Sequence, residues 1–420
     1  MQATNAELCF NARVIARPAL DVLRVEREWG WEDVQYDRLI VATGARERFL
    51  PFPGWTLPGV MGAGGLQAMV KSGLPIVGKR VVIAGSGPLL LAVAAGLARR
   101  GAHIVGVFEQ APTERLVRFG AMLLAQPSKL VEGFRYGGRL SRTYRTGSLV
   151  TQAIGNDHLN SVSVLVGKTR REIDCDYLGC GFHLVPNLEL PQLLGCEIDS
   201  GYVKVDDTLR TSVPQVYCAG EITGIGGLEK ALIEGEIAGL AATGRSVTRL
   251  IARRRRLVRF ASRLDAAFFP RREVRDLAGG DTIICRCEDV PRATLADCRN
   301  WHEAKLHTRC GMGSCQGRIC GPATGFLFGW AHDSVRPPLF SASISGLAAA
   351  CRPRTCVRPN DQECTIPIGP EVLQDHPRES VRRSEPQVKV TGAPNGELLP
   401  KSQTFKERIA AEAMKASGQH

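Results

Sequence analysis

The segment between residues 79 and 109 constrains the fold more than any other part of the chain. An apolar run precedes two closely spaced glycines, Gly85 and Gly87, with Pro88 next to them, and an alanine- and leucine-rich stretch follows. A second apolar run ends in Glu109. This order is typical of a strand, a phosphate-binding turn, a helix and a second strand of a parallel sheet. The segment therefore predicts an α/β dinucleotide-binding domain.

Nucleotide use by this segment has two interpretations. Glu109 falls where a ribose-binding carboxylate is expected, and it favours NAD over NADP because it would repel a 2′-phosphate. The loop Gly85-x-Gly87-x-x-Leu90 lacks the third glycine of the full pattern. We keep both alternatives: NAD binding through Gly85, Gly87, Pro88 and Glu109, or a nucleotide fold retained without turnover.

Four cysteines near residue 300 predict a metal centre. Cys285 and Cys287 form a C-x-C pair, and Cys315 and Cys320 form a C-x4-C pair. Four thiolates are the ligand set of a 2Fe–2S cluster. Zinc and plain structural cysteines are the alternatives, but structural zinc sites usually space the cysteines of a pair by two to four residues. We treat Cys310, five residues before Cys315, as a neighbour that does not bind the metal.

The composition limits the location and the partners. The chain has 420 residues, 14 cysteines and a net charge of +12, with no signal-peptide pattern at its start. Cysteine-rich chains of this kind usually lie in reducing compartments, so the cytoplasm is the expected location, with a peripheral inner-membrane position as an alternative. Ten arginines and one acidic residue lie between Arg245 and Arg272. Apolar residues at helical spacing make this block an amphipathic connecting helix rather than a nucleic-acid site.

Several longer stretches resemble one known family. They are Ala42-Thr43-Gly44 with the Pro-Phe-Pro-Gly-Trp run at 51–55, the glycine loop at 84–91, residues 219–227, and the cysteine module at 285–320. In these stretches the chain resembles the FAD- and 2Fe–2S-containing α subunits of hydrogen cyanide synthase, opine oxidase and the dye-linked proline or hydroxyproline dehydrogenases. The resemblance covers roughly residues 1–345.

The resemblance implies a fold and a domain plan. The expected fold is α/β, a disulfide-reductase-like flavoprotein with two dinucleotide-binding domains whose first βαβ unit is missing, followed by a small helical BFD-like 2Fe–2S domain. The expected domains are an FAD-domain remnant (1–75), an NAD-type domain (76–184), a return to the FAD domain (185–245), a basic connecting helix (246–278), the 2Fe–2S domain (279–347) and a disordered tail (348–420).

Four further site residues follow from the resemblance. Thr43 and Gly44 match the turn that approaches the flavin nucleotide. Gly220 and Glu221 match the second flavin motif, whose acidic residue meets the ribitol, with a structural helix cap as the alternative for Glu221. Because the first βαβ unit is missing, the resemblance predicts FAD as a cofactor but does not decide whether this chain binds it alone.

The resemblance also implies a function. The expected protein is an electron-transfer subunit of a multisubunit amine or amino-acid dehydrogenase, with a flavoprotein β subunit of the glycine/sarcosine-oxidase type as partner and a quinone or respiratory chain as acceptor. FAD and a 2Fe–2S cluster are the expected cofactors, and NAD is a third candidate. A stand-alone NADH-dependent reductase and a non-catalytic iron–sulfur module remain alternatives, and no catalytic residue is predicted.

Overall fold

All described residues fall within the first of two compact units, Met1–Arg352. The computed structural model describes residues 6–28, 30–123, 143–332 and 335–344. The tail expected to be disordered, 348–420, lies outside the described residues, as does a short helix that the sequence predicts at 405–416.

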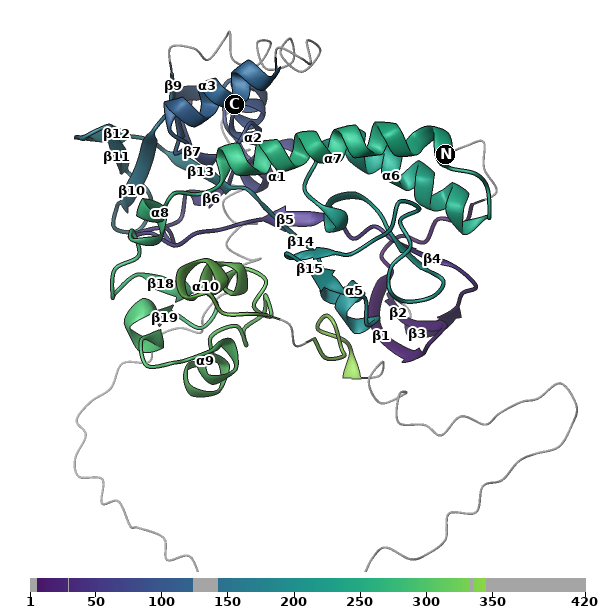
Figure 1. Cartoon of the computed structure of the whole chain (residues 1–420). Coiled ribbons are helices and arrows are strands. Elements are labelled where there is room, and N and C mark those ends of the chain that lie inside the picture. The colour runs from purple at the N-terminus through teal and green to yellow at the C-terminus, as the bar shows by residue number, and fades with distance from the viewer. Residues whose placement is uncertain (1–5, 29, 124–142, 333–334, 345–420) are drawn as a thin grey trace, which may run out of the picture. The chain divides into compact units, whose positions relative to one another are not determined.

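A five-stranded parallel sheet forms the centre of the dinucleotide-binding domain (Figure 1). Its order is β6-β13-β7-β8-β9, and every neighbouring pair is parallel. The strands are β6 (Val60–Gly62), β13 (Tyr177–Phe182), β7 (Arg80–Ser86), β8 (His103–Glu109) and β9 (Tyr144–Arg145). The strand–turn–helix–strand order predicted for 79–109 is confirmed.

Both faces of this sheet are covered, as a parallel sheet requires. Helices α1 (Ala63–Lys71) and α2 (Leu89–Ala98) cover one face, where Val81 and Ile83 of β7 pack. The next residues, Val82 and Ala84, point to the other face because side chains alternate along a strand. The antiparallel strands β10 (Ser148–Ile154), β11 (Ser161–Val166) and β12 (Thr169–Asp174) cover that face, so the meander predicted around 151–165 is confirmed.

An antiparallel meander begins the described chain. It consists of β1 (Arg13–Ala19), β2 (Val22–Arg27) and β3 (Gly30–Gln35). The apolar residues at 8–10 also predict a short strand, and this prediction is wrong, because the segment forms coil and turn. Leu8 is 52% exposed and Phe10 76% exposed, so no buried face stabilises an extended conformation there.

Short strands join segments that are far apart in the sequence. The parallel pair is β4 (Leu39–Val41) with β17 (Val216–Cys218), and the antiparallel pair is β5 (Ala45–Glu47) with β14 (Leu184–Pro186). Helix α5 (Glu189–Leu193), the hairpin of β15 (Ile198–Asp199) and β16 (Tyr202–Val203), and the 3-10 turn η1 (Gly220–Thr223) complete this region.

The basic segment forms a long helix that spans two cores. Helix α7 (Thr248–Phe268) packs on α6 (Gly227–Ala242) through its first half and on α3 (Thr113–Leu123) through its second half (Figure 1). Ala261 and Phe268 are buried, as the predicted amphipathic pattern requires. The arginine-rich helix therefore connects the two halves of the unit.

The cysteine module follows α7. It contains α8 (Arg272–Arg275), β18 (Ile283–Cys285), β19 (Val290–Pro291), the 3-10 turn η2 (Arg292–Leu295), α9 (Trp301–Thr308) and α10 (Cys320–Phe328). A small core of its own includes Ile284, Leu295 and Leu327. No helix among the described residues is both long enough and apolar enough to cross a membrane.

Candidate functional site

Three buried sulfur atoms form the centre of the cysteine module. The Sγ atoms of Cys285, Cys310 and Cys320 lie within 4.8 Å of one another. Cys285 ends β18, Cys320 begins α10, and Cys310 follows the left-handed residue that caps α9. All three are buried and free of disulfides. Thiols gathered in this way are a suitable ligand set for iron or zinc.

Two more cysteines extend the group toward solvent. Cys315 lies near both Cys320 and Cys287, which lower the pKa of its thiol. The Sγ atom of Cys287 lies 3.7 Å from the Ser314 hydroxyl. Among the described residues, the closest group of sulfurs thus contains two predicted ligands, Cys285 and Cys320, together with Cys310.

Sequence reasoning gave Cys310 no part in this site. The buried side chain nevertheless places its Sγ atom within 4.8 Å of those of Cys285 and Cys320. The one signal available was the regular five-residue step from Cys310 to Cys315 to Cys320. The predicted ligand set without Cys310 stays a prediction.

Mutual hydrogen bonding divides these thiols into proton donors and proton acceptors. The hydrogen bond from Cys310 lowers the pKa of Cys285 to about 2, and the bond from Cys320 lowers the pKa of Cys315 to about 5. The bond to Cys285 raises the pKa of Cys310 to about 12. Because the thiolate is the metal-binding form, the site is electrostatically prepared at Cys285 and Cys315.

Glycines allow the ligand loop to fold closely around the sulfurs. The Gly311 N–H donates to Cys285 Sγ at 3.5 Å. Gly311 has a φ of +82°, and a Cβ atom there would lie 2.4 Å from the Trp301 ring. A Cβ atom on Gly313 would lie 2.3 Å from the Cβ of Cys287. Any larger residue at either position would displace the loop.

The predicted ribose-binding residue is enclosed in the structure. Glu109 is 0% exposed and accepts hydrogen bonds from the Gly87 N–H at 2.7 Å and the Ala111 N–H at 2.8 Å. Burial raises the pKa of its carboxyl group to about 7. Glu109 thus binds the glycine loop itself, and a role in NAD binding stays a prediction.

The other residues of this loop differ in their surroundings. A Cβ atom on Gly85 would lie 1.9 Å from the carbonyl oxygen of Gly181 in β13, so the close approach of two strands requires glycine there. Gly87 is buried, and Pro88 is exposed at the start of α2. The close packing of β7 against β13 therefore explains the glycine at position 85 without a bound nucleotide.

The turn after β4 is held by a residue from the other half of the unit. The Thr43 hydroxyl donates to the Asn187 carbonyl at 2.7 Å, and the Asn187 side-chain amide donates to the Thr43 carbonyl at 2.8 Å. Gly44 has a φ of +68° with open space beside it. This exposed turn can accept a ligand, and the predicted flavin contact at Thr43 and Gly44 stays a prediction.

Glu221 caps the start of α6. Its two oxygens accept hydrogen bonds from the N–H groups of Gly226 and Gly227, at 3.0 and 2.9 Å. This geometry matches the helix-cap alternative and occupies the donors that were expected to face a phosphate or flavin. A ribitol contact through Glu221 stays a prediction.

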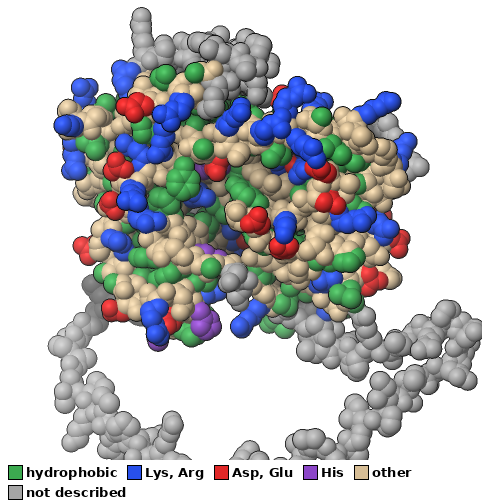
Figure 2. Space-filling model, viewed as in Figure 1, with side chains coloured by type: hydrophobic (Ala, Val, Ile, Leu, Met, Phe, Trp, Pro, Cys, Tyr) green, Lys and Arg blue, Asp and Glu red, His purple; other side chains and the backbone are tan. Residues whose placement is uncertain are grey.

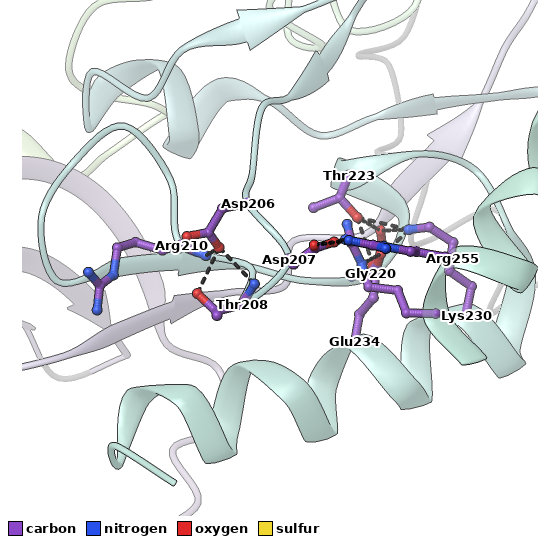
Figure 3. Close-up of polar contacts among 10 residues, drawn as sticks. Asp206, Asp207, Thr208, Arg210, Gly220, Thr223, Lys230, Glu234 and Arg255 are labelled. Atoms are coloured by element: carbon purple, nitrogen blue, oxygen red, sulfur yellow. Dashed lines mark hydrogen bonds and ion pairs between the residues drawn. The ribbon is translucent and has the colours of Figure 1, made fainter. Parts of the chain in front are cut away.

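A buried ionic network supports this turn. Lys230 Nζ donates to Glu234 at 2.7 Å, to Thr223 at 2.8 Å and to the Gly220 carbonyl at 2.9 Å, as Figure 3 shows. Arg254 of α7 donates to the second oxygen of Glu234 at 3.0 Å. Lys230 and Glu234 are almost fully buried, so the network fixes the turn at Gly220 against both helices.

The environments of the remaining histidine and cysteine candidates indicate structural or surface roles. His183 lies 3.4 Å from Asp265, and burial lowers its pKa. His302 and His307 are exposed on α9, as expected for surface residues. Burial raises the pKa of Cys175 to about 12, and Cys180 lies within β13, so this pair lacks the environment of a reactive dithiol.

One cavity of about 770 Å³ lies between the cysteine module and the strands after Gly44. Gln316 and Trp301 line it from the module, and Arg46 and Val185 line it from β5 and β14. Its cationic lining is Arg46, Arg48, Arg271, Arg272, Arg275, Lys305 and Arg318, against one carboxylate, Glu189. Lys and Arg side chains also outnumber acidic ones on the face shown in Figure 2.

A model of the pyridine nucleotide-disulphide oxidoreductase family matches residues 5–238, more than half of the chain. The chain belongs to this family. Membership in the pyridine nucleotide-disulphide oxidoreductases makes it an FAD-dependent oxidoreductase and implies binding of FAD and NAD(P). The α/β fold predicted from the sequence is thereby confirmed.

Individual relatives agree with the resemblance found in the sequence. The chain is 34% identical to the HcnB subunit of hydrogen cyanide synthase from Pseudomonas aeruginosa, over 80% of this chain and 77% of that protein. It is 31% identical to an opine oxidase subunit of Rhizobium meliloti strain 1021, over 84% and 85%. The fold is also similar to L-proline dehydrogenase from P. horikoshii, with a TM-score of 0.55 and 18% identity over 80% of this chain and 64% of that one.

Proposed function

We propose that this chain is the electron-transfer subunit of a multisubunit FAD- and 2Fe–2S-dependent amine or amino-acid dehydrogenase. The observation that carries the proposal is the group of Cys285, Cys310 and Cys320 sulfurs within 4.8 Å in a chain with an oxidoreductase fold. The proposed ligands remain Cys285, Cys287, Cys315 and Cys320, with Cys310 as their buried neighbour. A bound 2Fe–2S cluster would supply one-electron transfer. The cysteines would hold the irons, and the Gly311 N–H would stabilise negative charge on Cys285 Sγ.

The shared cavity supports electron transfer between the two parts. Gln316 of the cysteine module and Arg46 of β5 line the same space, and β5 directly follows the predicted flavin turn at Gly44. A flavin at this turn and a cluster at the cysteines would therefore lie on either side of one cavity. The proposal assigns FAD contacts to Thr43, Gly44, Gly220 and Glu221.

Substrate oxidation is assigned to a partner. The relatives are named as subunits, of hydrogen cyanide synthase and of opine oxidase. Among the described residues, His183 lies beside Asp265 with its pKa lowered by burial, and His302 and His307 are exposed on α9. We infer a β subunit of the glycine/sarcosine-oxidase type that oxidises an amine or amino acid, and a quinone or respiratory chain as the final acceptor.

The cluster can be tested on anaerobically purified protein. We expect a reddish-brown protein that contains about two irons and two sulfides per chain. After chemical reduction it should show the EPR signal of a reduced 2Fe–2S cluster. Cys285→Ser and Cys320→Ser should abolish the signal, whereas Cys298→Ser, a change in the same module, should retain it. A colourless, iron-free wild-type chain would refute the proposal, and NADH bleaching of the flavin at 450 nm without a partner would favour the stand-alone reductase.

A further inference from the structure

The end of helix α7 is bound by the glycine loop of the dinucleotide unit. The Ser86 hydroxyl donates to the carbonyl of Phe268. Gln110 Nε2 lies 2.9 Å from Ser86 Oγ and 3.4 Å from the carbonyls of Phe268 and Phe269, and Gln110 Oε1 accepts the Arg271 N–H at 3.0 Å. The carbonyls of Phe268 and of Phe269, which follows α7, are thereby capped by Ser86 of β7 and by Gln110, which follows β8.

This contact is a closed, packed interface. Ser86 is 3% exposed, Gln110 0% and Phe268 6%. Phe268 packs edge-on against Phe119 of α3, with the ring centroids 5.8 Å apart. The end of α7 therefore packs against Ser86 and Gln110 with both apolar side chains and backbone carbonyls.

The electrostatics of this arrangement oppose an anionic ligand. In a dinucleotide-binding unit the pyrophosphate lies against backbone N–H groups at the start of the helix after the glycine loop. Here the partially negative end of another helix points at the same loop. The loop donor at Gly87 is also occupied, because its N–H binds Glu109 at 2.7 Å. The enclosed residues therefore do not fit a bound NAD(P).

We propose that the end of α7 and the residues that follow it, 267–271 together, close the dinucleotide site of the βαβ unit at 79–109. This unit would then bind the end of α7 and exclude NAD(P)H. The carbonyls of Phe268 and Phe269 would place partial negative charge beside the loop at which the pyrophosphate would bind. Electrons would then reach this chain by a route other than NAD(P)H. This inference goes beyond the proposed electron-transfer role, and it distinguishes the chain from a stand-alone NADH-dependent reductase.

Calorimetric titration of the full-length chain tests the proposal, with NADH and the redox-inactive ADP-ribose as probes. We expect no saturable binding to the wild type up to about 1 mM. The double variant Ser86→Ala/Gln110→Ala removes the caps of α7. It should bind both probes with a Kd about tenfold or more below that limit. Gln152→Ala, the same change at an exposed position of β10, should behave as the wild type.

Each outcome decides the question. Micromolar binding by the wild type would overturn the proposal, and so would a double variant that keeps its circular dichroism and melting temperature yet binds neither probe. If the double variant does not fold, amide hydrogen exchange of the wild type gives the answer. Exchange at Arg271 should be unchanged by NADH, and faster exchange on addition of NADH would show that the nucleotide displaces the helix end.

Discussion

At the scale of single residues, Glu109 makes stability depend on pH. Its pKa in the folded chain is about 7, above the ordinary 4.5, because burial disfavours the charged form. The folded state therefore holds this proton more tightly, and the resulting stability is present at low pH and is lost as pH rises through about 7.

Comparison with Glu109→Gln measures this effect. We expect the unfolding free energy of the wild type to fall relative to that of the variant by about 2 kcal/mol between pH 5 and 8. Urea denaturation at a series of pH values provides the measurement. Parallel pH profiles for the two proteins would show that Glu109 titrates normally.

Lys230 is a second residue whose effect can be predicted. Lys230→Met would remove the cation that binds Glu234 at 2.7 Å and leave that buried carboxylate with Arg254 as its remaining ionic partner. We expect a loss of about 3 kcal/mol of unfolding free energy. Lys204→Met, which breaks an exposed pair with Glu197, is the matched control and should change stability little. Equal losses of unfolding free energy in the two variants would show that burial does not determine how much an ion pair stabilises this chain.

At the scale of elements, the loop between α9 and α10 depends on Gly311. Gly311→Ala would introduce both a left-handed alanine and a Cβ atom 2.4 Å from Trp301. Gly195→Ala isolates the first effect, because Gly195 has a φ of +81° and no atoms within 4 Å of the added Cβ. The control should lose about 1 kcal/mol of stability and keep its iron. Gly311→Ala should lose most of its iron, measured per chain, and full iron content in this variant would show that the loop tolerates the Cβ atom.

The sequence predicted elements whose signals are local. The apolar runs before Gly85 and Glu109 predicted β7 and β8, and paired cysteines predicted the convergence of Cys285 with Cys320. The position of Cys310 was missed, because its five-residue step to Cys315 repeats the step from Cys315 to Cys320 and spacing alone does not show which of the three sulfurs turn inward. The contact between Ser86 and Phe268 was also beyond prediction, since it joins a side chain to a carbonyl 182 positions away, and carbonyls leave no mark in a sequence.

At the scale of the whole molecule, Trp55 connects the dinucleotide domain with the cysteine module. Its ring is 2% exposed in the core of that domain, and its Nε1 donates to the Ile283 carbonyl of β18 at 2.6 Å. Trp55→Phe keeps an aromatic ring but leaves this carbonyl without that donor, at a cost of about 1–3 kcal/mol.

Because β18 ends in Cys285, we expect Trp55→Phe to lose its cluster absorbance at a lower urea concentration than the wild type. Trp31→Phe, at a 36% exposed position of the meander, should match the wild type. Coincident bleaching curves for all three proteins would show that the module holds its metal independently of the dinucleotide domain.

The ring of Trp301 fills the space beside Gly311, where any side chain would otherwise lie. An indole this close to the ligand loop would transfer its excitation to the broad visible absorption of bound iron and sulfide. If the proposed cluster is bound, the ultraviolet emission of Trp301 would be dim in loaded protein and bright after the metal is lost, so this emission would report the iron content.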